Sequence, residues 1–286
     1  MPGILLRIPY IQNKVSEVAT TQLSGHLGVP VKIGNVDIEW FNRLVLEGLY
    51  LEDQDGKVMF EANHVAAGFE IMPLLEGKFV FTTVRLFGFS FNLRKHTPES
   101  PLNLQFVIDA FASKDSIKKE KNIDLRFNSI MIRRGNFSYN VDSEKETPGK
   151  FNAKHIDIKN LSAKISLKAF NKDSVNAHIK KMSFDEASGF SLNKLSLNVV
   201  GNRDSAFVQD FEVRLPQTDL KIGRARIDLS EIDSLPALLN NAPIDLNITP
   251  SQICLKDLSP FVRRSRTSPT RLSYRPRQTA TSIILT

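Results

Sequence analysis

The chain has 286 residues, of which 41% are hydrophobic and 24% are charged, and its formal net charge is +7. These fractions are typical of a folded protein and exclude an intrinsically disordered chain. The charge is unevenly spread, because residues 263–286 hold six Arg and no acid, which leaves 32 basic and 31 acidic side chains in residues 1–262. A nearly neutral body argues against a nucleic-acid-binding surface over the fold.

The N-terminal residues predict a short apolar stub followed by a helix. Residues 1–10 are too few to span a bilayer or to form the apolar region of a signal peptide. Residues 11–28 place apolar side chains three and four positions apart, and Gly28 and Pro30 end the pattern. This amphipathic helix either caps the end of a sheet or lies on a membrane surface.

After Pro30 the apolar period becomes two, and one pattern recurs. We call it the bent-strand motif: two apolar residues one position apart, two spacers, and two more apolar residues. Clear copies are Val31/Ile33/Val36/Ile38, Phe79/Phe81/Val84/Leu86, Ile156/Ile158/Leu161/Ala163, Phe190/Leu192/Leu195/Leu197 and Leu220/Ile222/Ala225/Ile227, with a weaker copy at Ile130/Ile132/Gly135/Phe137.

The second spacer has a structural meaning. Side chains alternate between the two faces of a strand, so one extra residue would turn the second apolar pair to the wrong face. A β-bulge or tight bend absorbs that residue and curves the strand. The motif therefore predicts bent strands with one apolar and one polar face, which suits an antiparallel sheet. For the first copy, a two-residue hairpin at Gly34-Asn35 is an alternative.

The sequence predicts few helices after Pro30. Residues 101–112 and 229–240 predict two short helices, and residues 73–76 predict a single helical turn. These helices are too small to cover some fourteen strands, so the sheet either closes into a barrel or sandwich or curls into a trough with an apolar lining. We expect a mainly β (α+β) fold: a long, curved, largely antiparallel sheet that forms a trough or groove. The groove-lining candidates are Phe79, Phe81, Val84, Leu86, Ile156, Ile158, Leu161, Phe190, Leu192, Leu195, Leu197, Leu220 and Ile222.

The predicted domain organisation follows these changes of pattern. Residues 29–262 form the β-groove domain, with a possible joint at residues 95–122, where turn-rich and charged segments flank the second helix. Residues 263–286 are rich in Arg and show no strand period. This tail is an out-of-frame translation, a disordered linker, or a basic arm for nucleic acid or anionic lipid.

No local motif predicts catalysis. The five His are dispersed without metal-ligand spacing, and no phosphate-binding loop, nucleophile elbow or carboxylate pair occurs. The single Cys254 cannot form an internal disulfide, and we interpret it as a small apolar side chain. We therefore expect no enzyme activity, no cofactor and no metal site.

Residues 5–65 are similar to the N-terminal region of the TamB-like, AsmA-related family. The matching pieces occur in order: an apolar stub ending at Pro9, the helix QNKVSEVATTQLSGHLG, then VKIGNVDI, LVLEGLYLEDQDG and FEANHVAAGFEIMPLLEGKF. The later segments VRLFGFSFNL and IDLRFNSIMIRRGNFSY also fit, with Gly88 and Gly135 at turn or bulge positions. The resemblance extends to about Phe261 and fails over the tail.

The resemblance implies a periplasmic body anchored in the inner membrane by one N-terminal helix. Such proteins resemble bridges, in which a sheet curled into an apolar trough carries phospholipid or an unfolded outer-membrane protein towards the outer membrane. The family is linked to outer-membrane protein assembly and secretion with an outer-membrane barrel partner, and to phospholipid transport. The alternative is a structural or adhesive envelope β-domain that binds protein or glycan. Neither alternative involves nucleic acid.

The sequence departs from the family pattern at both ends. Residues 1–10 resemble only the last turn of the anchor helix, so we expect a remnant of a missing membrane anchor. Family members are also much longer, so we expect this chain to be an N-terminal fragment from a truncated or frameshifted gene.

Overall fold

The computed structural model describes residues 9–40, 42–75, 79–111, 123–170, 174–202, 205–228, 244–248, 251–261 and 271–274. The chain divides into two compact units, Met1–Leu161 and Ser162–Thr286, and each is described by itself below. The joint expected at residues 95–122 falls inside the first unit. The strand β7 (His155–Phe170) runs across the division.

Three α-helices lie in the described part of the first unit: α2 (Pro9–Leu27), α3 (Ile71–Leu75) and α4 (Gln105–Phe111). The helix expected at residues 11–28 is confirmed, and its C-terminal stop is Gly28, which has a positive φ of 69°. The turn expected at residues 73–76 is a short helix that begins at Ile71. The helix expected at residues 229–240 lies outside the described residues.

The helix expected at residues 101–112 begins at Gln105 instead of Pro101, so this prediction was wrong by four residues. The cause is Asn103, which pairs with β5 through two hydrogen bonds. The Asn103 N–H donates to the Arg94 carbonyl at 2.9 Å, and the Arg94 N–H donates to Asn103 Oδ1 at 3.0 Å. These bonds hold residue 103 in the turn that precedes the helix, and the helix starts after it.

The strands of the first unit are β1 (Val31–Lys32), β2 (Asn35–Glu39), β3 (Arg43–Glu52), β4 (Val58–Phe69), β5 (Phe79–Lys95), β6 (Ile123–Val141) and the first part of β7. Those of the second unit are the rest of β7 with β8 (Ser174–Glu186), β9 (Ser191–Asn202), β10 (Ser205–Arg214), β11 (Asp219–Asp228), β12 (Ile244–Ile248), β13 (Ser251–Cys254) and β14 (Arg271–Tyr274). A 3₁₀ turn at Leu255–Leu258 follows β13.

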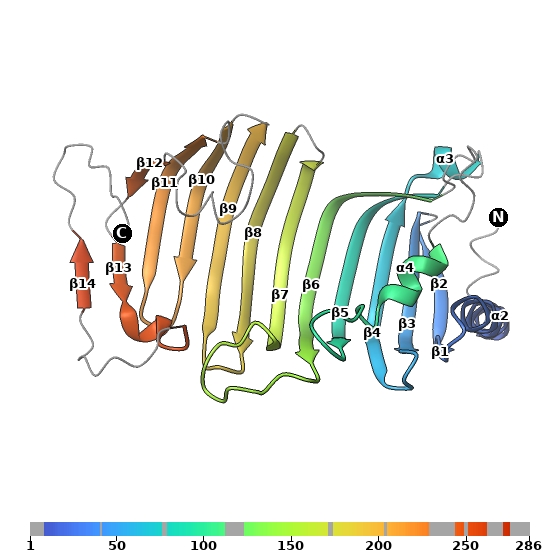
Figure 1. The fold of residues 1–286 in the computed structure, drawn as a ribbon. Helices are drawn as coiled ribbons and strands as arrows, with labels where there is room; N and C mark the ends of the chain where they lie inside the picture. Colours follow the sequence, from blue (N-terminus) through green and yellow to red (C-terminus); the bar gives the residue numbers. More distant parts are fainter. Residues whose placement is uncertain are drawn as a thin grey trace. The chain divides into compact units, whose positions relative to one another are not determined.

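Twelve of the described strands follow one another in the order β1-β3-β4-β5-β6-β7-β8-β9-β10-β11-β13-β14 (Figure 1). Beside this path, β2 pairs with β3 and β12 pairs with β11. Most pairs are antiparallel, whereas β5 and β6 are parallel and α4 lies between them in sequence. The expected fold class is confirmed: the protein is mainly β, with a large, mostly antiparallel open sheet and few helices.

Helix α2 packs on the edge of the sheet formed by β1 and β2. The buried side chains Val31, Ile33 and Val36 form a core with Ala19, Leu23 and Leu27 of the helix and Leu44, Leu46, Leu49 and Leu51 of β3. Polar residues fix the helix to the strand end: the Val31 N–H donates to Ser24 Oγ at 3.0 Å, and the Ile33 N–H donates to Thr20 Oγ1 at 3.2 Å. The helix therefore caps the sheet edge, as one sequence alternative proposed.

Part of the Arg-rich tail is also in the sheet. The sequence there shows no strand period, yet Arg271–Tyr274 forms β14 and pairs with Ser251–Cys254 of β13. Cys254 is buried, and its N–H donates to Thr218 Oγ1 at 3.0 Å, so it occupies an interior position as expected of a small apolar side chain.

Candidate functional site: the apolar face of the bent strands

The bends predicted from the motif occur at its spacers. Where β4 pairs with β5, Gly68 lies opposite Thr83 and the next residue, Phe69, lies opposite Phe81. Strand β5 therefore holds one extra residue, Thr82, at this point. The register also shifts at the spacers of β9, against β8, and of β11, against β12. The spacers of β6 and β7 each include a residue with positive φ, Arg134 at 53° and Asn160 at 57°.

The first copy of the motif is one bent strand and not a hairpin. Both β1 and β2 pair antiparallel with β3, and they keep the same register on either side of Gly34. The hairpin alternative at Gly34-Asn35 was therefore wrong. A Cβ atom at Gly34 would lie 3.0 Å from the Glu47 carbonyl oxygen, so the close approach of the two backbones explains the glycine.

Sequence reasoning missed four further copies of the motif, in strands β3, β4, β8 and β10. The signal was present in the same spacing; Ala and Met made it less conspicuous in β4, β8 and β10, whereas the β3 copy has Leu at all four positions. These copies are Leu44/Leu46/Leu49/Leu51, Phe60/Ala62/Val65/Ala67, Ala177/Ile179/Met182/Phe184 and Ala206/Val208/Phe211/Val213. Adjacent strands thus carry the motif repeatedly, which a scan of isolated segments does not reveal.

In the first unit the bends of neighbouring strands lie in register. Gly48 of β3, Asn63 of β4, Gly88 of β5 and Arg134 of β6 are successive cross-strand neighbours, and we call them the bend row. Apolar rows lie on both sides of it. One is Val36, Leu46, Val65, Leu86 and Ile132, and the other is Leu51, Phe60, Phe91 and Phe137.

Because each bend restores the side-chain direction, these rows form one apolar face, which we call the apolar strip of the first unit. Its aromatic rings contact one another across strands: the centroids of Phe60 and Phe91 are 5.7 Å apart, and those of Phe91 and Phe137 are 6.2 Å apart. Phe89 packs over Gly135, where a Cβ would lie 2.2 Å from its ring. Phe60, Phe91 and Phe137 remain half-buried, so part of this face is accessible.

The second unit has its own apolar strip. Met182, Leu195, Val213 and Leu220 are successive partners across β8, β9, β10 and β11. Phe190 lies beside this strip, with its ring centroid 6.0 Å from that of Phe184 and 5.1 Å from that of Phe261. Aromatic contacts therefore join apolar strand positions in each unit.

The thirteen groove-lining candidates fall into two groups. Phe81, Val84, Leu86, Ile156, Ile158 and Leu161 lie in the first unit and are half-buried. In the second unit Leu192 is buried, and Phe190, Leu195, Leu197, Leu220 and Ile222 are half-buried. The side chain of Phe79 lies outside the described residues. The structure thus brings Leu86 into the apolar strip of the first unit and Leu195 and Leu220 into that of the second unit. Val84 lies in a neighbouring row with Leu44, Ala67 and Ile130.

Sequence reasoning also missed a charged cluster at one end of the first unit. The Asp53 side chain is 2% exposed and that of Arg94 is 11% exposed, with Arg94 Nη2 3.1 Å from Asp53 Oδ2. Arg94 also pairs with Asp55, and the exposed His96 lies 3.2 Å from Asp55 and 3.3 Å from Asp142. The cluster joins the β3–β4 turn, the end of β5 and the residue after β6.

Hydrogen bonds determine the ionisation of Asp53. Burial alone would raise its pKa, but the side-chain amide of Asn103, the N–H groups of Lys57 and Asp55, and the charge of Arg94 together lower the pKa below its ordinary value of 3.8. Asn103 Nδ2 donates to Asp53 Oδ2 at 3.0 Å, and the Lys57 N–H donates to Asp53 Oδ1 at 2.9 Å. Asp53 is therefore a structural carboxylate, held charged at neutral pH.

Within the described residues, no group of three or more His, Cys, Asp and Glu side chains has a metal-binding arrangement. His26 and His155 contact backbone or amide oxygens instead: His26 Nε2 is 3.0 Å from the Ala110 carbonyl, and His155 Nδ1 is 3.1 Å from Asn140 Oδ1. Among the helices of this part of the chain, none has the length and apolarity needed to cross a membrane.

Comparisons of the chain with protein-family models, with curated proteins and with solved structures found no match.

Proposed function

We propose that the protein is the N-terminal part of a membrane-tethered periplasmic bridge of the TamB-like kind. It would shelter phospholipid acyl chains, or an unfolded outer-membrane protein segment, on the apolar faces of its bent strands. The observation that carries the proposal is the apolar strip of the first unit, whose rows stay in register across neighbouring strands on both sides of the bend row. The resemblance of residues 5–65 to that family adds the inner-membrane location and the outer-membrane barrel partner.

The physical basis is transfer of apolar groups from water. Burial contributes about 25 cal/mol per Å² of apolar surface, so a flexible acyl chain gains affinity from each row it covers. Phe, Leu, Ile and Val impose no directional hydrogen bonds, and a strip built from them accepts chains of different chemistry. Movement of such cargo along the strip requires no catalytic group.

The test uses neighbouring positions on opposite faces of β5. Leu86 lies in the apolar strip, whereas Arg85, one residue away, is exposed on the other face. A photo-crosslinking amino acid would be placed at either position in the full chain, in cells with both membranes, and the adducts identified by mass spectrometry. We expect phospholipid or unfolded-protein adducts at position 86 and few at position 85. Equal adducts at both positions, or none at position 86, would contradict the proposal.

A second experiment tests lipid binding by introducing a charge into the apolar strip. Leu86→Glu would place a carboxylate against the cargo, and we expect it to reduce co-purified phospholipid roughly tenfold, with Arg85→Glu as the matched control. Circular dichroism of both variants would confirm that the sheet remains folded. Retention of lipid by a folded Leu86→Glu protein would show that the lipid binds elsewhere.

A further inference from the structure

Two neighbouring turns at one end of the first unit carry the most exposed large apolar side chains that the structure describes. Trp40 lies in the turn between β2 and β3 and is 81% exposed, and Met72 of α3 is 72% exposed. Ile71, the first residue of α3, is also exposed. We call Trp40, Ile71 and Met72 the apolar tip. Exposed apolar groups that gather at one place mark a contact with another molecule or with a membrane.

The strand pairing brings the two turns together. Strands β2 and β4 both pair with β3, so their ends lie two strand spacings apart, roughly 10 Å. The Phe69 N–H donates to the Asn42 carbonyl at 2.8 Å, which fixes the end of β4 to the turn that holds Trp40. Figure 1 shows α3 just beyond the arrowhead of β4. The apolar tip is therefore one small surface, built from two segments that are distant in sequence.

The backbone holds Trp40 in an unfavourable conformation. Its φ is 52°, in the left-handed region that a large side chain seldom occupies and that Gly or Asn adopts at lower cost. Below it, Glu39 and Arg43 are cross-strand partners whose side chains form an ion pair at 3.1 Å, and the Asn42 N–H donates to the Glu39 carbonyl at 3.3 Å. Strained residues of this kind gather at binding sites. The ring itself therefore has a role, since neither the turn geometry nor core packing favours Trp here.

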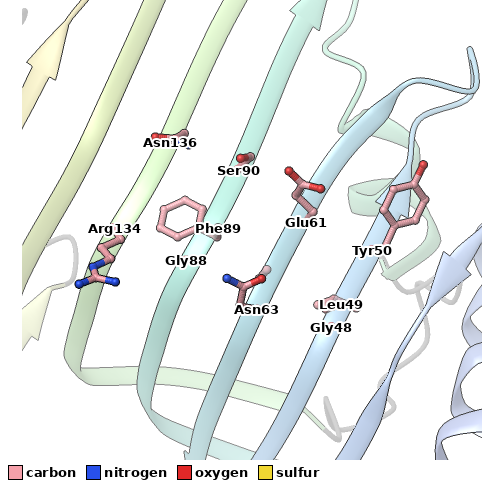
Figure 2. A pocket seen from close by; sticks show the side chains of 11 residues that line it. Gly48, Leu49, Tyr50, Glu61, Asn63, Gly88, Phe89, Ser90, Arg134 and Asn136 are labelled. Atoms are coloured by element: carbon pink, nitrogen blue, oxygen red, sulfur yellow. The ribbon is translucent and has the colours of Figure 1, made fainter.

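The apolar tip lies at the end of the apolar face of the first unit. Figure 2 shows the members of the bend row on four successive strands. Between the bend row and the tip the apolar face continues through two rows, which are Leu46, Val65, Leu86 and Ile132, and then Leu44, Ala67, Val84 and Ile130. The second row includes Leu44, four residues after Trp40, and Ala67, four residues before Ile71. The apolar strip thus leads towards the tip.

The described charges nearest the tip do not favour an anionic partner. Glu39 and Arg43 neutralise each other, and the exposed Glu70 directly precedes Ile71. A contact made by the tip is therefore driven by its apolar side chains and not by attraction between charges.

A bilayer fits this surface better than a second folded protein. The three side chains expose at most a few hundred Å², whereas each partner in a stable protein interface buries roughly 800 Å². Trp combines an apolar ring with one N–H donor, a combination that is favoured at the level of the lipid headgroups. Ile and Met are apolar throughout and suit the acyl chains beneath them.

We propose that the apolar tip inserts into the surface of a phospholipid bilayer, with the Trp40 ring among the headgroups and Ile71 and Met72 against the acyl chains. This contact would place the end of the apolar strip at the membrane, where an acyl chain passes from the bilayer to the strip. The insertion stands on the tip alone, and only its link to lipid transfer rests on the proposed function.

The chain contains one Trp, so fluorescence excited selectively in Trp reports on position 40 alone. The full chain would be mixed with vesicles of phosphatidylcholine, which carry no net charge and do not attract the Arg-rich tail. We expect the emission to shift to shorter wavelengths and to be quenched by brominated phosphatidylcholine. Emission that stays unchanged at every vesicle concentration would overturn the proposal.

Met72→Asp tests the tip and keeps Trp40 as the probe. A carboxylate loses its hydration when it enters the bilayer, so we expect this change to weaken partitioning into the vesicles about tenfold. Ile108→Asp is the matched control, because Ile108 is exposed on α4, which follows the bonds of Asn103 to the opposite end of β5. Circular dichroism would confirm that both variants fold. Equal partitioning of the wild-type protein and folded Met72→Asp would contradict the proposal.

Two further results would overturn the assignment to a bilayer. A shift that grows with protein concentration without vesicles, together with self-association in sedimentation equilibrium, would mean that a second copy covers the tip. Binding to anionic vesicles alone, lost at high salt, would place the contact on basic residues elsewhere. The crosslinking test at position 86 reports on the apolar strip itself, so either proposal can fail while the other holds.

Discussion

Both units hold residues with positive φ where their strands bend, but only the first unit is described with glycine among them. In the first unit these residues are Gly48 of β3, Gly88 of β5, Arg134 of β6 and Asn160 of β7. In β10 of the second unit the bend falls on Asp210, with φ of 52°, and the register against β9 shifts there. The bend therefore depends on one extra residue and not on glycine itself, since other side chains also occupy the left-handed conformation at these points.

The units also differ in how their charges are held. Asp53 and Arg94 of the first unit form a buried pair that is supported by Asn103. In the second unit, Glu212 pairs with Lys194 and lies 2.6 Å from Arg214, and both basic side chains are substantially exposed. Hydrogen bonding by Lys194 is the main cause that lowers the pKa of Glu212, against the opposing effect of burial. A buried pair costs more to break than an exposed one, which provides the first test of this comparison.

Asp53→Ala should have the largest effect. It leaves Arg94 without its buried partner, with only the more exposed Asp55 and Asp142 nearby, and removes the acceptor for the Asp55 and Lys57 N–H groups. We therefore expect a loss of about 3–5 kcal/mol in the free energy of unfolding of the first unit. Urea denaturation, combined with hydrogen exchange resolved by peptide, would assign the loss to β3, β5 and the β3–β4 turn. An effect below 1 kcal/mol would show that the cluster is not an essential support.

The same site predicts a pH dependence. The folded-state pKa of Asp53 is lowered, so its contribution is fully present above the ordinary value of 3.8 and is lost as the pH falls through the lower folded-state pKa. The stability difference between the wild-type protein and Asp53→Asn should therefore narrow below a pH of about 4. A difference that stays constant down to pH 2 would mean that Asp53 is not the titrating group.

Gly88→Ala should have the next largest effect, because it combines a positive φ with a Cβ placed 2.6 Å from Asn63 Nδ2. We expect a loss of about 1–3 kcal/mol, together with a displaced Asn63 side chain. Gly25→Ala is the control, since a Cβ there meets no atom within 4 Å and the helical backbone tolerates it. Equal stability of both variants would show that the bend in β5 does not need glycine.

Asp210→Gly tests the corresponding bend of the second unit in the opposite direction. Glycine relieves the cost of a positive φ but adds conformational freedom to the unfolded chain, so we expect a net change between zero and a gain of about 1 kcal/mol. Thermal unfolding measures the change in the free energy of unfolding, and hydrogen exchange of the β10 amides shows whether the change is local to this strand. A loss above 1 kcal/mol would mean that the carboxylate has a stabilising role of its own.

Glu212→Gln should have the smallest effect. Its partners are partly exposed, with side-chain accessibilities of 31% for Lys194 and 47% for Arg214, so we expect a loss of about 0.2–1 kcal/mol that diminishes at high salt. Comparison with Asp53→Ala in the same urea titrations would then measure the difference between an exposed and a buried ion pair. A loss as large as that of Asp53→Ala would contradict the distinction between the two units.

Much of the fold could be predicted because the apolar period is local. Two spacers between apolar pairs can be accommodated in a strand only by a bend, so the bulges of β5, β9 and β11 followed from spacing alone. The end of α2 at Gly28 followed from the same kind of local chemistry. The start of α4 did not, because Asn103 is held by the backbone of Arg94 and by the side chain of Asp53, which is fifty residues away in sequence.

The polar features were harder to predict. Asp53, Arg94 and Asn103 are spaced like ordinary turn and strand residues, and nothing in their local sequence marks them as neighbours. Their contact depends on the antiparallel pairing of β3 with β4 and of β4 with β5.

The sequence by itself determined that the protein is mainly β, that its strands bend, and which positions of each motif are apolar, since these properties depend on residues a few positions apart. Only the tertiary structure decided that the bends of β3, β4, β5 and β6 align into one row, because strand register is set by pairing between distant segments. That alignment joins the apolar positions into a continuous strip on one face of the first unit.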